Sequence, residues 1–322
     1  MIRDDLRHID YFSLDISDYS RNYILRLLPN LDYYLQIYDR CISILLSTLR
    51  RQPSQLTVVD YGGGHGFLSC LLKERGFARV IYIDFNPQAA SAVTAVRQCL
   101  GYGPDVILQG DAATLRHWCQ QNAIRPDGLL GMDVIEHIYR LDTFFADLYA
   151  IAPMPMLFTT GSTPYNPHVV RRLHRVMRSD EHGRNGQPGF CQLRRQYLAE
   201  HLPQLSAQEL DYWAEHTRGL RYDDLIKAVV SKTPAPAVDP YNTCDPTTGS
   251  WTERILPIKA YRQLLTPYGA RLSVTGGFYN THRSPFKALP SRLLNLILRI
   301  GGKGCLFLAP FIILQIDTPA AS

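Results

Sequence analysis

The stretch Thr57-Val58-Val59-Asp60-Tyr61-Gly62-Gly63-Gly64-His65-Gly66-Phe67 joins an apolar run to a turn rich in glycine. Only a backbone that approaches a ligand very closely needs so many glycines between a strand and a helix, because a Cβ atom there would block the ligand or forbid the turn. The next apolar run ends in an acid, Asp84. The stretch therefore predicts a strand, a turn and a helix that form a nucleotide-type cofactor pocket.

The spacing of the glycines narrows the choice of ligand. Asp60, Gly62, Gly64 and Gly66 fit the pattern D-x-G-x-G-x-G, whereas the dinucleotide pattern G-x-G-x-x-G would need a glycine at Phe67. A phosphate-binding loop would end in Gly-Lys-Ser or Gly-Lys-Thr, and this turn has neither the lysine nor the hydroxyl. An acid that faces the turn suits a ligand with an ammonium group or free hydroxyls better than one with phosphates. The pattern favours S-adenosylmethionine.

Three further stretches resemble those of the class I S-adenosylmethionine-dependent methyltransferases. Residues 80–87 are similar to the family's second strand, whose terminal acid binds both ribose hydroxyls. Residues 109–112 resemble the end of the third strand, beside the adenine, and residues 126–138 resemble the fourth strand with its D-V-x-E-H continuation. The resemblance implies S-adenosylmethionine as cofactor and S-adenosylhomocysteine (SAH) as product. It places the cofactor on Asp60, Gly62, Gly63, Gly64, Gly66, Asp84, Phe85, Asp111, Ala112, Met132 and Asp133.

The resemblance also implies an α/β protein with the Rossmann-like methyltransferase fold, a seven-stranded, mostly parallel sheet with an antiparallel edge hairpin. Short β-branched runs alternate with amphipathic helices, which is typical of a parallel sheet covered on both faces. The predicted parallel strands are 56–61, 80–84, 105–109, 128–133 and 155–160. Two later runs, 270–279 and 304–316, fit the edge hairpin.

Changes in pattern divide the chain into three predicted parts. Residues 1–52 form an N-terminal helical segment, in which Pro29 separates two helices. Residues 53–164 and 255–322 form the cofactor-binding core, and residues 165–254 an inserted helical lid over the methyl acceptor. Within the lid we expect helices at 168–177, 191–202, 206–217 and 222–230, followed by the proline-rich break at 233–240.

Three segments outside the motifs allow two interpretations each. Tyr33, Tyr34 and Tyr38 either reach the cofactor site or pack the N-terminal helices on the sheet. Residues 291–300 form a basic amphipathic helix, which we expect to face the core, with a membrane surface as the alternative. Residues 242–254 are dense in polar groups around one tryptophan, and they are either acceptor pocket or linker.

Composition is that of a globular enzyme. The chain has 322 residues, 46% of them hydrophobic and 20% charged, so it can bury a substantial core. Its net charge of +5 is mild, and the basic residues are scattered except for the run from Arg171 to Arg184, so nucleic acid is not the expected partner. The expected partner is a small-molecule or carrier-linked acceptor, and the sequence leaves the oligomeric state open.

The cysteines and the apolar runs indicate the compartment. Seven cysteines form no C-x-x-C pair, which argues against a disulfide framework and a zinc site. No secretory signal is visible, and the longest apolar stretch, 305–316, is interrupted by Pro310 and is too short to span a membrane. We therefore expect a cytoplasmic protein without a membrane span, for which peripheral membrane contact stays open.

Three side chains just after the fourth predicted strand are the candidate catalytic residues. Asp133, Glu136 and His137 fall within one turn, where the family places acceptor-side residues. His137 could act as a general base towards an acceptor hydroxyl, the three together could hold a divalent metal with His168 or His182, or the cluster could be structural. We favour the base and expect no metal. The metal alternative resembles ubiquinone-pathway O-methyltransferases and small-RNA 2′-O-methyltransferases, although those begin the cluster with glutamate.

Candidate acceptor contacts follow the fifth predicted strand. Tyr165 and Asn166 stand between two prolines, so they either bind the acceptor or only form a turn. Arg171 begins a run of arginines at helical spacing that could hold a phosphate or carboxylate. The leading hypothesis is O-methylation of a small molecule or a carrier-linked sugar or lipid. The alternatives are a metal-assisted RNA 2′-O-methyltransferase and an inactive, cofactor-binding partner subunit.

Overall fold

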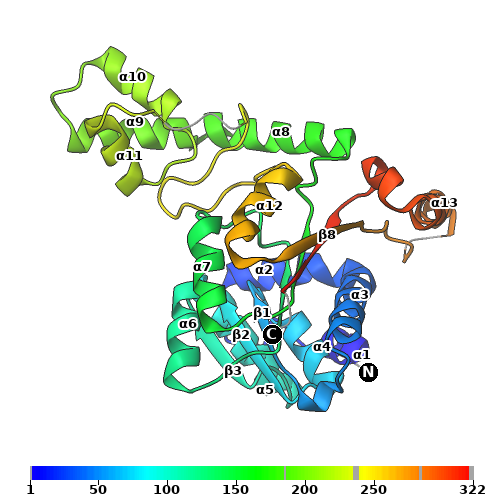
Figure 1. Ribbon diagram of the computed structural model, residues 1–322. Coiled ribbons are helices and arrows are strands. Elements are labelled where there is room, and N and C mark those ends of the chain that lie inside the picture. Colours follow the sequence, from blue (N-terminus) through cyan, green and yellow to red (C-terminus); the bar gives the residue numbers. More distant parts are fainter. Residues whose placement is uncertain (1, 185, 235–238, 283–284, 319–322) are drawn as a thin grey trace.

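The computed structural model describes residues 2–184, 186–234, 239–282 and 285–318. Within these residues, strands form a seven-stranded sheet in the order β3-β2-β1-β4-β5-β9-β8. β1 to β5 are parallel, and β9 is antiparallel to both β5 and β8 (Figure 1). This is the predicted Rossmann-like methyltransferase fold. The strands are β1 (Thr57–Tyr61), β2 (Arg79–Asp84), β3 (Val106–Gln109), β4 (Gly128–Met132), β5 (Met156–Thr160), β8 (Arg271–Gly276) and β9 (Ile312–Asp317).

Helices cover both faces of the sheet, which is why the central strands are apolar almost throughout. The helices of the N-terminal segment and the two helices after β1 and β2 share one hydrophobic core on one face of the sheet. Figure 1 shows this helical layer on the opposite side of the sheet from α6 and α7. The first layer consists of α1 (Ile2–His8), α2 (Asp18–Leu27), α3 (Leu31–Leu49), α4 (Phe67–Glu74) and α5 (Pro87–Leu100). The second consists of α6 (Ala112–Gln121), α7 (Leu141–Ile151) and α12 (Ile258–Leu265).

The order of the strands positions the site. The chain runs outward from β1 to β3 and then returns to the other side of β1 with β4. Ligands of open parallel sheets bind at the carboxyl ends of the strands, where the order reverses. The glycine turn after β1 and the acidic cluster after β4 meet at this point.

The N-terminal helices divide as predicted. α2 and α3 are separated by the 3₁₀ turn η1 (Leu28–Asn30), which contains Pro29. Proline lacks the N–H that an α-helix needs and fixes φ, so the chain changes direction there. The short helix α1 before them was not predicted.

One predicted strand is only half right. The run 304–316 begins with the 3₁₀ helix η4 (Gly302–Leu308), and only its second half forms β9. Pro310 lies between them and has no N–H to donate to a sheet ladder, so the strand cannot extend through it.

The insertion is helical, as expected, and it has a small core of its own. Its helices are α8 (Pro167–His182), α9 (Phe190–His201), α10 (Ala207–His216) and α11 (Tyr222–Val230). Leu198, Trp213 and Leu225 are buried between the last three, and Figure 1 shows these helices projecting beyond the sheet at the end of α8. A short hairpin of β6 (Gly183–Arg184) and β7 (Gln187–Pro188), which was not predicted, follows α8. Residues 235–238 of the proline-rich break and residues 319–322 of the predicted core lie outside the described residues.

The helix α13 (Pro285–Gly301) is where the sequence-based interpretation was wrong. We expected its apolar face to point at the core, yet Leu293, Leu296 and Ile300 are exposed. Among the described residues, no helix is both long enough and apolar enough to pass through a bilayer.

Candidate functional site

The turn after β1 is too tightly packed for side chains. Gly62, Gly64 and Gly66 all adopt positive φ angles, of 65°, 52° and 79°, which residues with a Cβ rarely adopt. A Cβ at Gly62 would also lie 2.3 Å from Val134, and one at Gly66 would lie 2.1 Å from Val93. The turn can therefore come close to a ligand only with these glycines in place.

Asp84, the last residue of β2, holds the turn in place. Its Oδ2 accepts a hydrogen bond from the Gly64 N–H at 2.9 Å, and its Oδ1 accepts one from the Asn86 N–H at 2.9 Å. Burial raises the pKa of this carboxyl, and the two backbone N–H groups act in the opposite direction. Each carboxylate oxygen keeps a second lone pair, so the group can accept hydroxyl donors from a ligand.

The side chain of Asp60 packs against the backbone of the turn. It is buried, and its Oδ2 accepts a hydrogen bond from the Ser69 hydroxyl at 2.6 Å. A Cβ at Gly63 would lie 2.7 Å from the same carboxylate oxygen, so the turn rests directly on this side chain. Burial raises the pKa of Asp60 to about 7. Asp60 is thus packed against the backbone of the turn and is not among the residues that line the cavity beside it.

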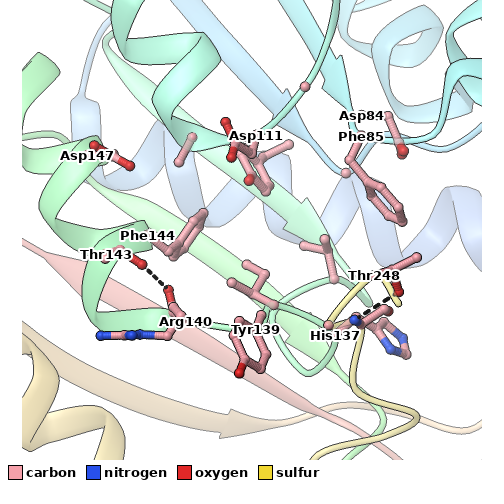
Figure 2. Close-up of a pocket in the computed structure, with 18 of the residues that line it drawn as sticks. Asp84, Phe85, Asp111, His137, Tyr139, Arg140, Thr143, Phe144, Asp147 and Thr248 are labelled. Carbon is pink, nitrogen blue, oxygen red and sulfur yellow. Dashed lines mark hydrogen bonds between the residues drawn. The ribbon is translucent and has the colours of Figure 1, made fainter. Parts of the chain in front are cut away.

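A cavity of about 390 Å³, here called the nucleoside cavity, opens beside the turn. Figure 2 shows Asp84, Phe85 and Asp111 on one side of it and His137, Tyr139 and Thr248 on the other. Phe85 is 62% exposed, so its side chain is open to a ligand in this cavity. The predicted cofactor residues that line the cavity are Gly62, Asp84, Phe85, Asp111 and Ala112.

Asp111 reaches the nucleoside cavity because it caps a helix. Its Oδ1 accepts a hydrogen bond from the Thr114 N–H at 3.1 Å at the start of α6, which anchors the carboxylate. Ala112, the next residue, is buried and small. The arrangement leaves Oδ2 of Asp111 as an acceptor at the cavity wall.

His65, inside the turn, was not assigned a role from the sequence. Its ring is stacked on Tyr23 of α2, with 4.6 Å between the centroids, and neither ring nitrogen has a hydrogen-bond partner among the residues that the structure describes. Burial lowers the pKa of His65 to about 4, so the ring is neutral at physiological pH. Both ring nitrogens are therefore available to a polar group that enters beside the turn.

The three candidate catalytic residues come together at the carboxyl end of β4. Asp133 has a positive φ of 49°, which aspartate tolerates better than most residues, and its N–H donates to the Thr159 carbonyl at 3.1 Å. Glu136 is buried and accepts hydrogen bonds from the Thr160 hydroxyl at 2.7 Å and the Gly161 N–H at 3.1 Å. β4 and β5 thus hold the cluster between them.

Glu253 completes this cluster, and sequence reasoning missed it. One ligand atom each of Glu136, His137 and Glu253 lie within 4.8 Å of one another, an arrangement that could hold a metal ion. The third potential ligand is therefore Glu253 rather than Asp133, His168 or His182. Burial, and then the charge of Asp133, raises the pKa of Glu136 well above its usual range. A proton or a cation is needed to relieve repulsion between the carboxylates.

The orientation of His137 is fixed by a backbone carbonyl. Its Nδ1 lies 2.7 Å from the Trp251 carbonyl oxygen, which can only accept, so Nδ1 carries the proton. Nε2 then keeps its lone pair. The Trp251 N–H in turn donates to the His137 carbonyl at 3.2 Å, so the segment that returns from the insertion is bound to this residue on both sides. In the sequence, only the density of polar residues in 242–254 indicated that this segment is more than a linker.

A second cavity, of about 340 Å³ and here called the acceptor cavity, has Asp133 in its wall. Tyr33 and Tyr34 of α3 line it together with Asp133, but neither lines the nucleoside cavity. Tyr33 and Tyr38 also pack against the core. Arg172 of α8 and Tyr279 after β8 complete its wall. Burial of the Asp133 carboxyl, and then the negative charge of the neighbouring Glu253, raises the pKa of Asp133.

The remaining predicted residues lie elsewhere. Met132 is at the end of β4, where its sulfur is 3.7 Å from the Thr159 hydroxyl. Asn166 is buried, its side chain makes hydrogen bonds within the protein, and it lines neither of the two cavities, so its contact with the acceptor stays a prediction. Asn166 Oδ1 accepts from the His168 and Val169 N–H groups, and its Nδ2 donates to the Ala309 carbonyl at 3.0 Å.

Two further acceptor assignments fall outside the cavities. Arg171 is exposed on α8, and its neighbour Arg172 lines the acceptor cavity instead. Both arginines are exposed, and helical spacing identified the run but not which member borders the cavity. Tyr165 is more than a third exposed and lines neither of the two cavities described above.

Comparisons with known proteins give similarity only to solved structures. No protein-family model matches the chain, and no curated protein matches it significantly. Magnesium protoporphyrin IX methyltransferase from Synechocystis, with bound SAH, is 15% identical over 89% of this chain and 84% of that chain, with a TM-score of 0.42. A SAM-dependent methyltransferase from Anabaena variabilis is 11% identical over 87% and 84%, also with a TM-score of 0.42. Similarities this weak carry no conclusion about ligands or activity.

Proposed function

We propose that this protein is an S-adenosylmethionine-dependent methyltransferase that acts in the cytoplasm on an oxygen atom of a small molecule or a carrier-linked sugar or lipid. The observation that carries the proposal is the pairing of Asp84 with Gly64 beside the nucleoside cavity. A bare turn, an acid that both fixes it and keeps acceptor capacity, and an exposed aromatic ring next to them suit a nucleoside with free ribose hydroxyls.

The same residues support one orientation of the cofactor. The adenine would lie against Phe85 and Ala112, with Asp111 accepting from its amino group, and the ribose hydroxyls would donate to Asp84. The methionine end would then pass over the glycine turn towards His65 and Tyr23. The acids Asp84 and Asp111 flank the turn, which disfavours a ligand with phosphates there.

This orientation directs the methyl group to the space between the two cavities. Methyl transfer is an in-line displacement: an acceptor oxygen forms a bond to the methyl carbon, and the carbon–sulfur bond breaks to leave a neutral thioether. The enzyme mainly has to align the two reactants and take up the hydroxyl proton. We assign the proton to His137 Nε2, because the Trp251 carbonyl holds Nδ1 protonated. The carboxyl groups of Glu136 and Asp133 lie near this ring, and their negative charge would stabilise it once it has taken up the proton.

Metal-assisted transfer is a second candidate, and the cluster of Glu136, His137 and Glu253 favours it. Two carboxylates and an imidazole form a donor set that suits a divalent cation, which would polarise an acceptor oxygen when bound. The His137 ring is oriented through its second nitrogen, as is common for metal-bound histidines. The same contact serves a general base equally well. The described residues show no basic, aromatic track that would single out RNA as the acceptor.

Calorimetry and a transfer assay together test these proposals. SAH should bind to the purified protein, and labelled methyl groups from S-adenosylmethionine should appear in an acceptor fraction of a cell extract. Binding without transfer would favour the inactive partner subunit, and no SAH binding would refute the proposal. Activity that is lost with a chelator and restored by magnesium would favour the metal-assisted route, whereas activity unaffected by the chelator would remove it.

A further inference from the structure

The helix α13 carries its apolar side chains on the outside of the protein. At about 3.6 residues per turn, the six exposed positions span an arc of roughly 100° and form one continuous stripe. Phe286 is 94% exposed and Ile300 78%. The stripe, here called the α13 stripe, consists of Phe286, Leu289, Leu293, Leu296, Ile297 and Ile300. Figure 1 shows α13 at the edge of the molecule, beyond α3.

The opposite face of α13 attaches it to the protein. Ala288 and Leu298 are buried. Asn295 accepts a hydrogen bond from the Tyr279 N–H at 2.7 Å and donates one to the Tyr279 carbonyl at 3.0 Å. The polar Asn295 thus points towards the protein and the leucines of the stripe point away, so the exposure of the stripe follows from how the helix is fixed.

The charged side chains on α13 and just after its end are all basic. The sequence contains no aspartate or glutamate between Glu253 and Asp317. Arg292 and Arg299 are exposed on the helix next to one edge of the stripe, and Lys303 is exposed just after its end. Apolar side chains bordered by cations suit a bilayer with anionic headgroups, because the apolar stripe enters the acyl boundary while the cations meet the phosphates.

We propose that α13 docks this protein on an anionic membrane surface and that the methyl acceptor is an amphiphile of that membrane. The second part rests on the proposed function. Ser291 of α13 lines the acceptor cavity, together with Tyr279, Asp133 and Arg172. The acceptor cavity thus borders the attached face of the same helix that carries the stripe on its outer face, and Arg172 in its wall suits an anionic head.

A second copy of the chain fits the stripe less well than a membrane. A pair of copies joined through this face would bring Arg292 and Arg299 of both chains together without an acid nearby to compensate them. Anionic lipid supplies that compensation.

Vesicle flotation with the full chain tests the docking. The protein should float with phosphatidylcholine vesicles that contain phosphatidylglycerol and bind pure phosphatidylcholine much more weakly. Ile300→Glu should lower the vesicle affinity about tenfold or more. Arg292→Gln and Arg299→Gln should each lower it about fivefold on anionic vesicles only. The matched control is Val230→Glu, at the end of α11, where the side chain is 70% exposed but far from the stripe in sequence. It should float like the parent protein.

Three results would overturn the docking: no flotation with anionic vesicles, flotation unchanged by Ile300→Glu, or a dimer in solution that Ile300→Glu dissociates. SAH binding, measured on the same samples, separates this inference from the proposed function. A protein that binds SAH but no vesicles refutes the docking alone, and one that binds vesicles but no SAH refutes the methyltransferase assignment alone. If docking holds, labelled methyl groups should enter the lipid extract of membranes. Transfer only into the water-soluble fraction would refute the amphiphile.

Discussion

The Asp84 carboxylate and the Gly64 backbone are joined by a hydrogen bond of 2.9 Å between Oδ2 and N. The two residues lie on different elements, at the end of β2 and in the turn after β1. One side chain therefore shapes the turn and also faces the nucleoside cavity. Loss of this carboxylate removes both functions at once.

Replacement of Asp84 by alanine should weaken SAH binding by on the order of 2 kcal/mol, about thirtyfold in Kd, because hydrogen bonds to a charged group are lost. Calorimetry with SAH measures it. Asp39→Ala is a control, because it removes an exposed carboxylate that pairs with Arg75 on the surface. Equal SAH affinity for the Asp84 variant and the parent protein would contradict the assignment.

Replacement of His137 by phenylalanine should lower kcat by about a hundredfold, the usual contribution of a general base, and leave SAH affinity unchanged. The size of the ring is preserved, while Nε2 is lost. His168→Phe, on the exposed side of α8, should leave kcat as it is. Unchanged turnover in the His137 variant would show that the proton is taken by another group.

Arg172→Ala should reduce methyl transfer at low acceptor concentration, because Arg172 lines the acceptor cavity. Its neighbour provides the matched control: Arg171→Ala removes the same charge from the exposed surface of the same helix. SAH affinity should be the same in both variants. Equal transfer by the two variants would remove Arg172 from the acceptor site.

Asn166→Ala should lower the free energy of unfolding by about 1–2 kcal/mol, because the side chain caps α8 and also holds the Ala309 carbonyl. Urea denaturation measures this. The variant should still bind SAH with the parent's affinity. A fully stable variant that has lost acceptor binding would contradict this structural role and support the prediction that Asn166 is an acceptor contact.

His65 should make stability depend on pH. Its pKa is about 4 in the folded protein and near 6.5 when unfolded, so between these values the unfolded chain binds the extra proton. The contribution of His65 is therefore present above about pH 6.5 and is lost as the pH falls towards 4. The difference in unfolding free energy between the parent protein and His65→Phe should change by on the order of 3 kcal/mol across that range. A pH-independent difference would show that the ring is not buried as described.

Local patterns were sufficient for the cofactor side of the site. The glycines of the turn, the acid that ends β2 and the acid that begins α6 lie within short stretches whose elements follow directly from hydrophobic periodicity. The parallel strands β1 to β5 formed within a residue of their predicted limits for the same reason. Their place in the wall of the nucleoside cavity could therefore be predicted from the sequence, and their binding of the cofactor stays a prediction.

The acceptor side depends on contacts between distant segments. Glu253 joins Glu136 only because the chain returns from the insertion along His137, and no local pattern encodes that return. Arg171 and Arg172 are both exposed on α8, and only Arg172 borders the acceptor cavity, which depends on how α8 packs against the rest of the protein. The orientation of α13 is set by the paired hydrogen bonds between Asn295 and Tyr279, so hydrophobic periodicity alone assigned its apolar face to the wrong side.

A crystal structure of the protein with SAH is the most direct test of the central claim. The account predicts the adenine against Phe85 and Ala112, both ribose hydroxyls on Asp84, and the sulfur between the nucleoside and acceptor cavities. Crystals grown with saturating SAH that leave the nucleoside cavity empty, or that hold SAH away from the glycine turn, would contradict it.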